Sequence, residues 1–305
     1  MRNAFLDELT RQAEADADVV LITGDLGFGV FEDFERRFPK QYINAGVAEQ
    51  NMTMVATGMA LEGKKVYTYS IGNFPSLRCL EQIRNDICYH DANVTIIGMG
   101  GGFSYGQLGM SHHATEDMSI LRALPNMTLV VPGSAGEVCA AMQDLYRHQG
   151  PAYLRLDKSK FEGDAEAQDF EIGRARVLRQ GNDITLVSAG GILEEVLDAA
   201  DALATAGIES RILSMHTIKP LDGESIDAAV RETRGIVTIE ENTIVGGLGS
   251  AVAEHSLEQP TRPGFFKRIG LRDTYSSVVG DQKYLRRHYQ MDSEFLVQTV
   301  KSLLQ

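Results

Sequence analysis

One carboxylate, Glu49, stands near the start of an apolar helical segment within the sequence YINAGVAEQNM of residues 42–52. Burial among alanine, valine and methionine side chains disfavours the charged form of a carboxyl group unless a hydrogen-bond donor compensates. Glu49 is therefore a candidate acid–base group. A simpler interpretation stays open, because a glutamate in the first turn of a helix is favoured there by the helix dipole.

A glycine-rich loop follows an expected strand in the sequence GMGGGFSYGQLGMSHH of residues 98–113. Its six glycines indicate a tightly turned loop at the carboxyl end of a sheet, where α/β proteins bind ligands. The paired His112 and His113 suit proton transfer or hydrogen bonding to an oxyanion near neutral pH. The alternative is an exposed or metal-scavenging pair, although neither histidine is flanked by Asp, Glu or Cys at a ligand spacing that repeats elsewhere.

A third glycine-rich segment, GGLGS at residues 246–250, follows an expected strand and opens an expected helix. This position suggests a phosphate-binding turn, but the spacing is not GxGxxG, so a closely packed strand-to-helix turn is favoured. The three cysteines, Cys79, Cys88 and Cys139, lack metal-ligand spacing and lie among apolar neighbours. They indicate no metal site and a reducing compartment.

These segments lie between apolar runs of strand length that alternate with helical patterns, which predicts an α/β fold with mostly parallel sheets. A polar, acidic stretch over residues 157–183 divides the chain, so we expect two doubly wound domains. In the first half, strands are expected at 19–23, 65–70, 94–99, 127–132 and 152–156, and helices at 47–61, 77–89 and 134–148 with Ser134 as N-cap. In the second half, strands are expected at 184–188, 211–214, 236–240 and 266–271, and helices at 192–206, 222–233 and 248–257.

The composition, 43% hydrophobic and 23% charged over 305 residues, is that of a globular chain long enough for two domains. A formal net charge of −13 gives no general attraction to phosphate backbones or anionic lipid. No run approaches the ~18 apolar residues of a membrane span, and the N-terminal MRNAFLDEL turns acidic where a signal peptide would be apolar. We therefore expect a cytoplasmic protein without nucleic-acid or membrane partners.

Several motifs, in order along nearly the whole chain, resemble the C-terminal half of transketolases. They are GVAEQN at residues 46–51, the loop ending GMSHH at 109–113, LRALPNM at 121–127, and EEN at 240–242 followed by GGLG at 246–249. The resemblance implies a pyrimidine-binding domain over residues 1–160, a linker over 161–182 and a transketolase C-terminal domain over 183–305.

The resemblance also implies a cofactor, thiamine diphosphate, and residues that would bind it. Glu49 would hydrogen-bond the aminopyrimidine ring and favour the tautomer that activates the cofactor, which itself does the carbon chemistry. Asp25 matches a family aspartate near the cofactor. Phe74 would stack on the pyrimidine ring.

Other residues match the family's substrate contacts. His112 matches a catalytic histidine that contacts the substrate, and we expect His113 beside it as a second contact. Arg155 matches an arginine that grips a substrate phosphate. The alternative for Arg155 is a strand-end arginine paired with Asp157.

Two positions depart from the family pattern. Leu108 stands where family members usually carry an aspartate, and its side chain removes a polar contact to a sugar hydroxyl. The family's phosphate-binding histidine falls at Gly100 or nearby. We therefore expect an anionic sugar substrate other than an ordinary pentose phosphate.

The chain lacks the Gly-Asp-Gly motif with a downstream Asn that holds Mg²⁺ and diphosphate in this family, since GDLG at residues 24–27 is not that motif. Because the cofactor lies between two chains in the family, the resemblance implies one subunit of a split transketolase. An N-terminal partner subunit would supply the Mg²⁺ ligands, in a heterotetramer of two copies of each chain. The complex would transfer a two-carbon ketol unit from a ketose to an aldehyde, and this chain would be active only within it.

Three alternatives remain. The LRALPNM motif and the paired histidines favour a transketolase over the beta subunit of a 2-oxoacid dehydrogenase decarboxylase. A deoxyxylulose-phosphate synthase fragment is disfavoured because the chain starts with its own Met1 before the first helix. Retention of Glu49, Phe74 and His112 argues against a non-catalytic scaffold subunit.

Overall fold

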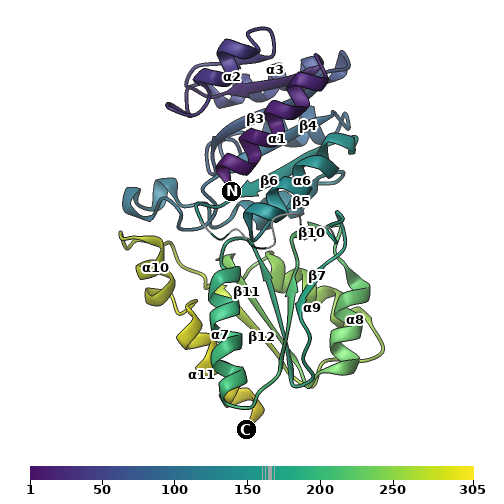
Figure 1. The fold of residues 1–305 in the computed structure, drawn as a ribbon, viewed down its shortest axis with the longest axis vertical. Coiled ribbons are helices and arrows are strands. Elements are labelled where there is room, and N and C mark those ends of the chain that lie inside the picture. The colour runs from purple at the N-terminus through teal and green to yellow at the C-terminus, as the bar shows by residue number, and fades with distance from the viewer. Residues whose placement is uncertain (160, 162, 164–166, 168) are drawn as a thin grey trace.

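The computed structural model describes residues 1–159, 161, 163, 167 and 169–305 and contains two α/β units, one above the other in Figure 1. The expected fold class, two α/β domains with mostly parallel sheets, is confirmed. The N-terminus lies near the boundary between the units, and the C-terminus lies at the far end of the second (Figure 1). None of the helices in the described ranges is long and apolar enough to cross a membrane.

The first sheet has seven strands in the order β10-β5-β6-β4-β3-β1-β2. All neighbours are parallel except β10 and β5. Helices cover both faces of the sheet, so its central strands are apolar along their length. The strands are β1 (Val19–Thr23), β2 (Tyr42–Asn44), β3 (Lys65–Ile71), β4 (Val94–Met99), β5 (Thr128–Val130), β6 (Ala152–Leu156) and β10 (Thr217–Lys219).

Helices α1 (Arg2–Ala15) and α6 (Ala135–Arg147) pack together over one face of this sheet. The hydroxyl of Ser134 accepts the N–H of Glu137, which confirms the expected N-cap of α6. The opposite face carries α3 (Glu49–Leu61), α4 (Leu80–Gln82) and a π-helix (Ile83–Cys88), so the helix expected over 77–89 is shorter and partly π-helical. The remaining helices of this half are α2 (Glu32–Arg37) and α5 (Asp117–Arg122).

The second sheet has five strands in the order β12-β11-β8-β9-β7. Helices α7 and α11 pack on one face, and α8 and α9 pack on the other. The strands are β7 (Arg176–Arg179), β8 (Ile184–Ala189), β9 (Ser210–Ser214), β11 (Ile236–Thr243) and β12 (Phe266–Leu271). The helices are α7 (Leu193–Thr205), α8 (Gly223–Glu232), α9 (Leu248–Glu258), α10 (Gln282–His288) and α11 (Ser293–Leu304).

Three short strands differ from the expectation. β2 was not expected, because three residues are too few to show a hydrophobic period. β7 lies inside the segment 161–182 expected as a linker and pairs antiparallel with β9, while residues 162, 164–166 and 168 of that segment lie outside the described residues. β10 leaves the second half of the chain and pairs antiparallel with β5 at the edge of the first sheet. β7 has four residues with an arginine at each end, and β10 has three residues and ends on a lysine, so no hydrophobic period marks either strand.

The two sheets share one hydrophobic cluster. It joins Met52 and Leu129 of the first half to Val187, Leu213 and Leu248 of the second. The halves are therefore packed against each other through apolar side chains.

Candidate functional site

The carboxyl ends of β1, β3, β4 and β6 meet at one edge of the first sheet, because these strands are parallel and in register. In open α/β sheets this edge is where ligands bind. Asp25 follows β1, Phe74 follows β3, the glycine-rich loop follows β4 and Lys158 follows β6.

Glu49 is the first residue of α3 and is only 2% exposed. Its Oε2 accepts a 2.7 Å hydrogen bond from Nη1 of Arg78. Gly24 lies against the carboxylate, since a Cβ added there would lie 3.2 Å from Cγ of Glu49. The expected position of Glu49 at a helix start is confirmed, and its role toward a cofactor stays a prediction.

Phe74 and His112 lie beside this ion pair. The guanidinium carbon of Arg78 is 4.6 Å from the centroid of the Phe74 ring. The His112 ring approaches Phe74 edge-on at 5.4 Å, and its Nδ1 is 3.0 Å from Oγ of Ser111. The structure therefore brings Glu49, Phe74 and His112 together through Arg78, a residue that the sequence analysis did not single out.

Asp25 supports the same edge through the loop that leads into α3. Nδ2 of Asn44 donates to Oδ1 of Asp25 at 3.0 Å. Oδ1 of Asn44 accepts the N–H of Asp25 at 3.2 Å and the N–H of Gly46 at 2.9 Å. Asp25 thus helps to fix the turn that places Glu49.

His113 is turned away from this group and is 1% exposed. Its Nδ1 lies 2.5 Å from Oγ of Ser276, and its Nε2 lies 3.3 Å from the carbonyl oxygen of Gly106. Burial lowers the pKa of His113 and so favours its neutral ring. These contacts connect the glycine-rich loop to the second half of the chain. A substrate contact by His113 stays a prediction, and the buried position of its ring does not support it.

Arg155 is also buried, with 4% of the residue exposed. Its Nε lies 3.2 Å from Oδ2 of Asp117, and its Nη2 donates to the carbonyl oxygens of Ala114 at 2.6 Å and Glu241 at 2.9 Å. The alternative weighed above, a strand-end arginine in an ion pair, is favoured, with Asp117 as the partner in place of Asp157. Binding of a substrate phosphate by Arg155 stays a prediction without support from these contacts.

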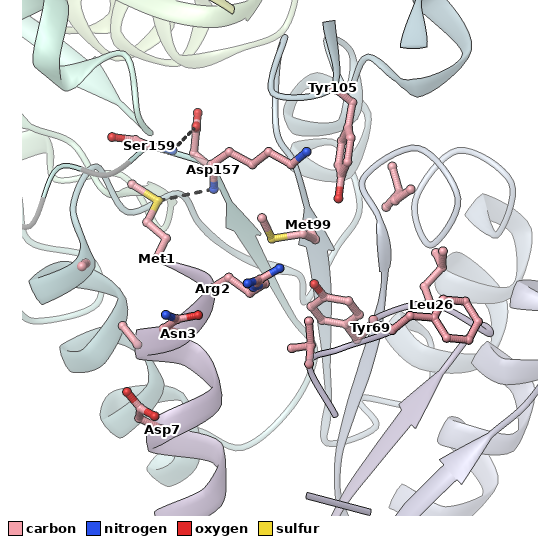
Figure 2. A pocket seen from close by; sticks show the side chains of 17 residues that line it. Met1, Arg2, Asn3, Asp7, Leu26, Tyr69, Met99, Tyr105, Asp157 and Ser159 are labelled. Carbon is pink, nitrogen blue, oxygen red and sulfur yellow. Dashed lines mark hydrogen bonds between the residues drawn. The ribbon is translucent and has the colours of Figure 1, made fainter. Parts of the chain in front are cut away.

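A cavity of about 790 Å³ lies at the same strand ends, on the side covered by α1 and α6 (Figure 2). Arg2 lines it from the start of α1, Tyr69 and Met99 line it from β3 and β4, and Tyr105 and Lys158 line it from the following loops. Figure 2 shows the side chains of Arg2, Tyr69, Met99 and Tyr105 turned toward one common space.

Charged side chains of both signs line this cavity: Arg2 and Lys158, with Asp7 and Asp157. Nζ of Lys158 lies 3.5 Å from the centroid of the Tyr105 ring. Burial and the positive charge of Arg2 lower the pKa of Lys158. The carboxylate of Asp157 accepts the N–H of Ser159 at 2.8 Å. The two cations and the nearby phenol groups are the lining groups that suit an anionic ligand.

The sequence analysis missed Arg2 and Lys158 because neither belongs to a motif of its own. Lys158 stands two residues after Leu156, the last residue of β6, and this position at a strand end was the available signal. No comparable signal marks Arg2, which reaches the cavity only because α1 packs across the sheet.

The turn at residues 246–250 is closely packed, as expected. The carboxylate of Glu240 accepts the N–H groups of Leu248 at 2.7 Å and Gly249 at 2.8 Å, at the start of α9. A Cβ added to Gly247 would lie 2.0 Å from Oε2 of Glu240. A protein carboxylate thus already satisfies this helix N-terminus.

No three His, Cys, Asp or Glu side chains are grouped to hold a metal ion in the part of the chain that the structure describes. Cys79 and Cys88 are buried, Cys139 is half-buried, and all three are free thiols.

Two family models match the chain. Residues 1–163 match the pyrimidine-binding domain of transketolase, and residues 173–294 match the transketolase C-terminal domain.

Relatives match along nearly the full length of both chains. One of the subunits of an apulose-4-phosphate transketolase, from Phocaeicola vulgatus, is 35% identical over 98% of this chain and 95% of its own. A 6-deoxy-6-sulfo-D-fructose transketolase subunit of a Clostridium species is 34% identical over 97% of this chain and 92% of its own. A solved split-gene transketolase, described as an inactive beta4 tetramer, is 33% identical with a TM-score of 0.88, covering 99% of this chain and 97% of its own.

Proposed function

The chain belongs to the transketolase family, and from this premise we propose that it is the C-terminal subunit of a split transketolase that uses thiamine diphosphate. The complex transfers a two-carbon ketol unit from an anionic ketose to an aldehyde. The observation that carries this proposal is the group of Glu49, Phe74 and His112 at the strand ends, joined by Arg78.

The residues of this group fit an aminopyrimidine ring. No hydrogen bond among the described residues reaches Oε1 of Glu49, so this oxygen is open to a donor on a ligand. Phe74 offers an aromatic face within the same group. Thiamine diphosphate supplies the carbon–carbon chemistry when bound. Glu49 holds a proton at a ring nitrogen, Phe74 fixes the plane of the ring, and Asp25 steadies the loop before Glu49 through Asn44.

We assign the anionic end of the sugar to the cavity with Arg2 and Lys158, in place of the buried Arg155. His112, whose ring lies 5.4 Å from that of Phe74, contacts the substrate nearer the cofactor. The names of the two relatives support an anionic substrate, since one specifies a phosphate and the other a sulfo group.

The partner is an N-terminal transketolase subunit that supplies the ligands for Mg²⁺ and diphosphate. Helix α3 and the residues before it present an exposed apolar stripe of Val47, Met54, Val55 and Leu61. A stripe of this kind marks a protein contact, and we assign it to a second copy of this chain. The complex then contains two copies of each subunit. Its location is the cytoplasm, which the three free cysteines support.

The decisive experiment compares Glu49→Gln with wild type in the complex with the partner subunit. The measured quantity is the rate of hydrogen–deuterium exchange at C2 of thiamine diphosphate. Loss of one acid–base contact slows exchange by at least ~10². Glu62→Gln, an exposed glutamate just beyond the same helix, is the matched control and keeps the wild-type rate. A wild-type exchange rate in Glu49→Gln contradicts the proposal.

A further inference from the structure

Arg78 contacts both residues that we assign to the pyrimidine ring. Its Nη1 donates to Glu49 at 2.7 Å, and its guanidinium lies over the Phe74 ring at 4.6 Å. Its main-chain carbonyl accepts a 3.1 Å hydrogen bond from Nε2 of Gln50, on the first turn of α3. One residue therefore spans the segment after β3 and the start of α3.

The two members of the ion pair differ in burial. The side chain of Glu49 is 2% exposed, whereas that of Arg78 is 46% exposed. A buried carboxylate without a cation is costly, because desolvation penalises its charge. Arg78 reaches in from the solvent side and compensates this charge through Oε2 alone, so Oε1 stays available.

We propose that Arg78 is a positioning residue, which fixes the Glu49 carboxylate relative to the Phe74 ring and keeps one carboxylate oxygen open for the pyrimidine. This inference rests on the proposed function of the site. Arg78 acts on the cofactor through Glu49 and Phe74 and takes no proton itself, since a guanidinium stays charged at all working pH values.

The geometry uses both properties of a guanidinium. Its charge pairs with the carboxylate, and its broad, weakly hydrated cation lies over the Phe74 ring. A lysine at this position keeps the charge but loses the broad cation over the ring. Arg78→Lys therefore retains part of the function, whereas Arg78→Met loses both parts.

The test measures the cofactor KM and kcat for the complex with the partner subunit. Loss of a charge-assisted hydrogen bond in Arg78→Met raises the cofactor KM by about tenfold or more. Arg78→Lys restores the KM in part.

A double-mutant cycle separates positioning from general support of the fold. Because Arg78 acts partly through Glu49, adding Arg78→Met to Glu49→Gln slows C2 exchange by a smaller factor than adding it to the wild type. Arg84→Met, at an exposed arginine in the adjacent π-helix, is the matched control and leaves the KM unchanged. Thermal unfolding monitors folding, and Arg78→Lys carries the comparison if Arg78→Met does not fold.

Two outcomes overturn the positioning role. One is a wild-type KM in the folded Arg78 variants, and the other is fully additive losses in the cycle. Either result leaves the proposed function intact as long as Glu49→Gln slows exchange. Wild-type exchange in Glu49→Gln, in contrast, removes the proposed function itself and the positioning role with it.

Discussion

The ring of Tyr105 fills the space that a side chain at residue 100 would take, since a Cβ added to Gly100 would lie 2.1 Å from Cε2 of Tyr105. Gly100 also has a φ of 85°, which glycine adopts without strain. The same ring lies 3.5 Å from Nζ of Lys158. The Tyr105 ring thus leaves no room for a side chain at residue 100, at or near the position of the family's phosphate-binding histidine. The same ring contacts the ammonium group of Lys158 at the cavity. Leu108 is the other position that departs from the family pattern, and this residue is 55% exposed.

We expect Lys158→Met to lower kcat/KM for a phosphorylated or sulfonated ketose by about tenfold or more, because a charge-assisted contact to the anion is lost. An uncharged ketose should change little. Steady-state kinetics of the complex on a charged donor and its uncharged analogue check this. Lys301→Met, at an exposed lysine of α11, is the control without effect. Equal losses on both donors would remove Lys158 from anion recognition.

Arg155→Met should lower the free energy of unfolding by about 3 kcal/mol or more, because Asp117 is left as a buried charge without its cation. Urea unfolding monitored by circular dichroism measures this change. Unchanged stability, combined with a loss of kcat/KM confined to charged donors, would instead support the predicted grip on a substrate phosphate.

The isolated chain should bind thiamine diphosphate weakly and turn over no ketose, because the ligands for Mg²⁺ and diphosphate are assigned to the partner. Mixing with the partner subunit should restore both properties. Calorimetry and a ketose assay, with and without the partner, make the comparison. Micromolar cofactor binding and normal turnover by this chain alone would refute the split-enzyme proposal.

Stability should depend on pH through His216, which is fully buried and stacks on Phe170 at 3.9 Å. Burial and the positive charge of Arg176 lower the pKa of His216 from 6.5 to about 3. Below pH 6.5 the unfolded chain binds a proton at this ring that the folded chain does not, so stability falls as the pH falls toward 3.

Between pH 6.5 and pH 5 this histidine should therefore cost about 2 kcal/mol of unfolding free energy. Urea unfolding at both pH values measures the loss, and His216→Gln should lack this part of it. The same pH dependence in wild type and variant would show that other groups cause it.

Much of the fold is predictable because the central strands are buried on both faces. β1, β4 and β6 have the bounds expected from their apolar runs, and the edge strand β12 also has its expected bounds. β2, β7 and β10 could not be predicted, since pairing with other strands defines them and they are too short to show a pattern of their own. Likewise, the turn at residues 246–250 could be interpreted locally because its spacing excluded a dinucleotide motif.

The sequence predicts only part of the candidate site. Glu49 and His112 belong to motifs, Phe74 was expected from the family resemblance, and the structure brings the three together. Arg78 and Lys158 are ordinary surface cations in the sequence, and their importance comes from what lies opposite them in space. Conversely, Arg155 matches a family position and His113 was expected to contact the substrate, yet both are buried and their polar atoms contact other parts of the protein.

Because β10 comes from the second half of the chain and completes the first sheet, the two halves do not separate into independent fragments. A fragment ending before Thr217 would leave β5 as an open edge, with unpaired N–H and C=O groups ready to pair with another molecule. It would also expose the apolar side chains of the shared cluster to water. Gene fission between these two domains would therefore yield two fragments prone to aggregation, and selection should keep them on one reading frame.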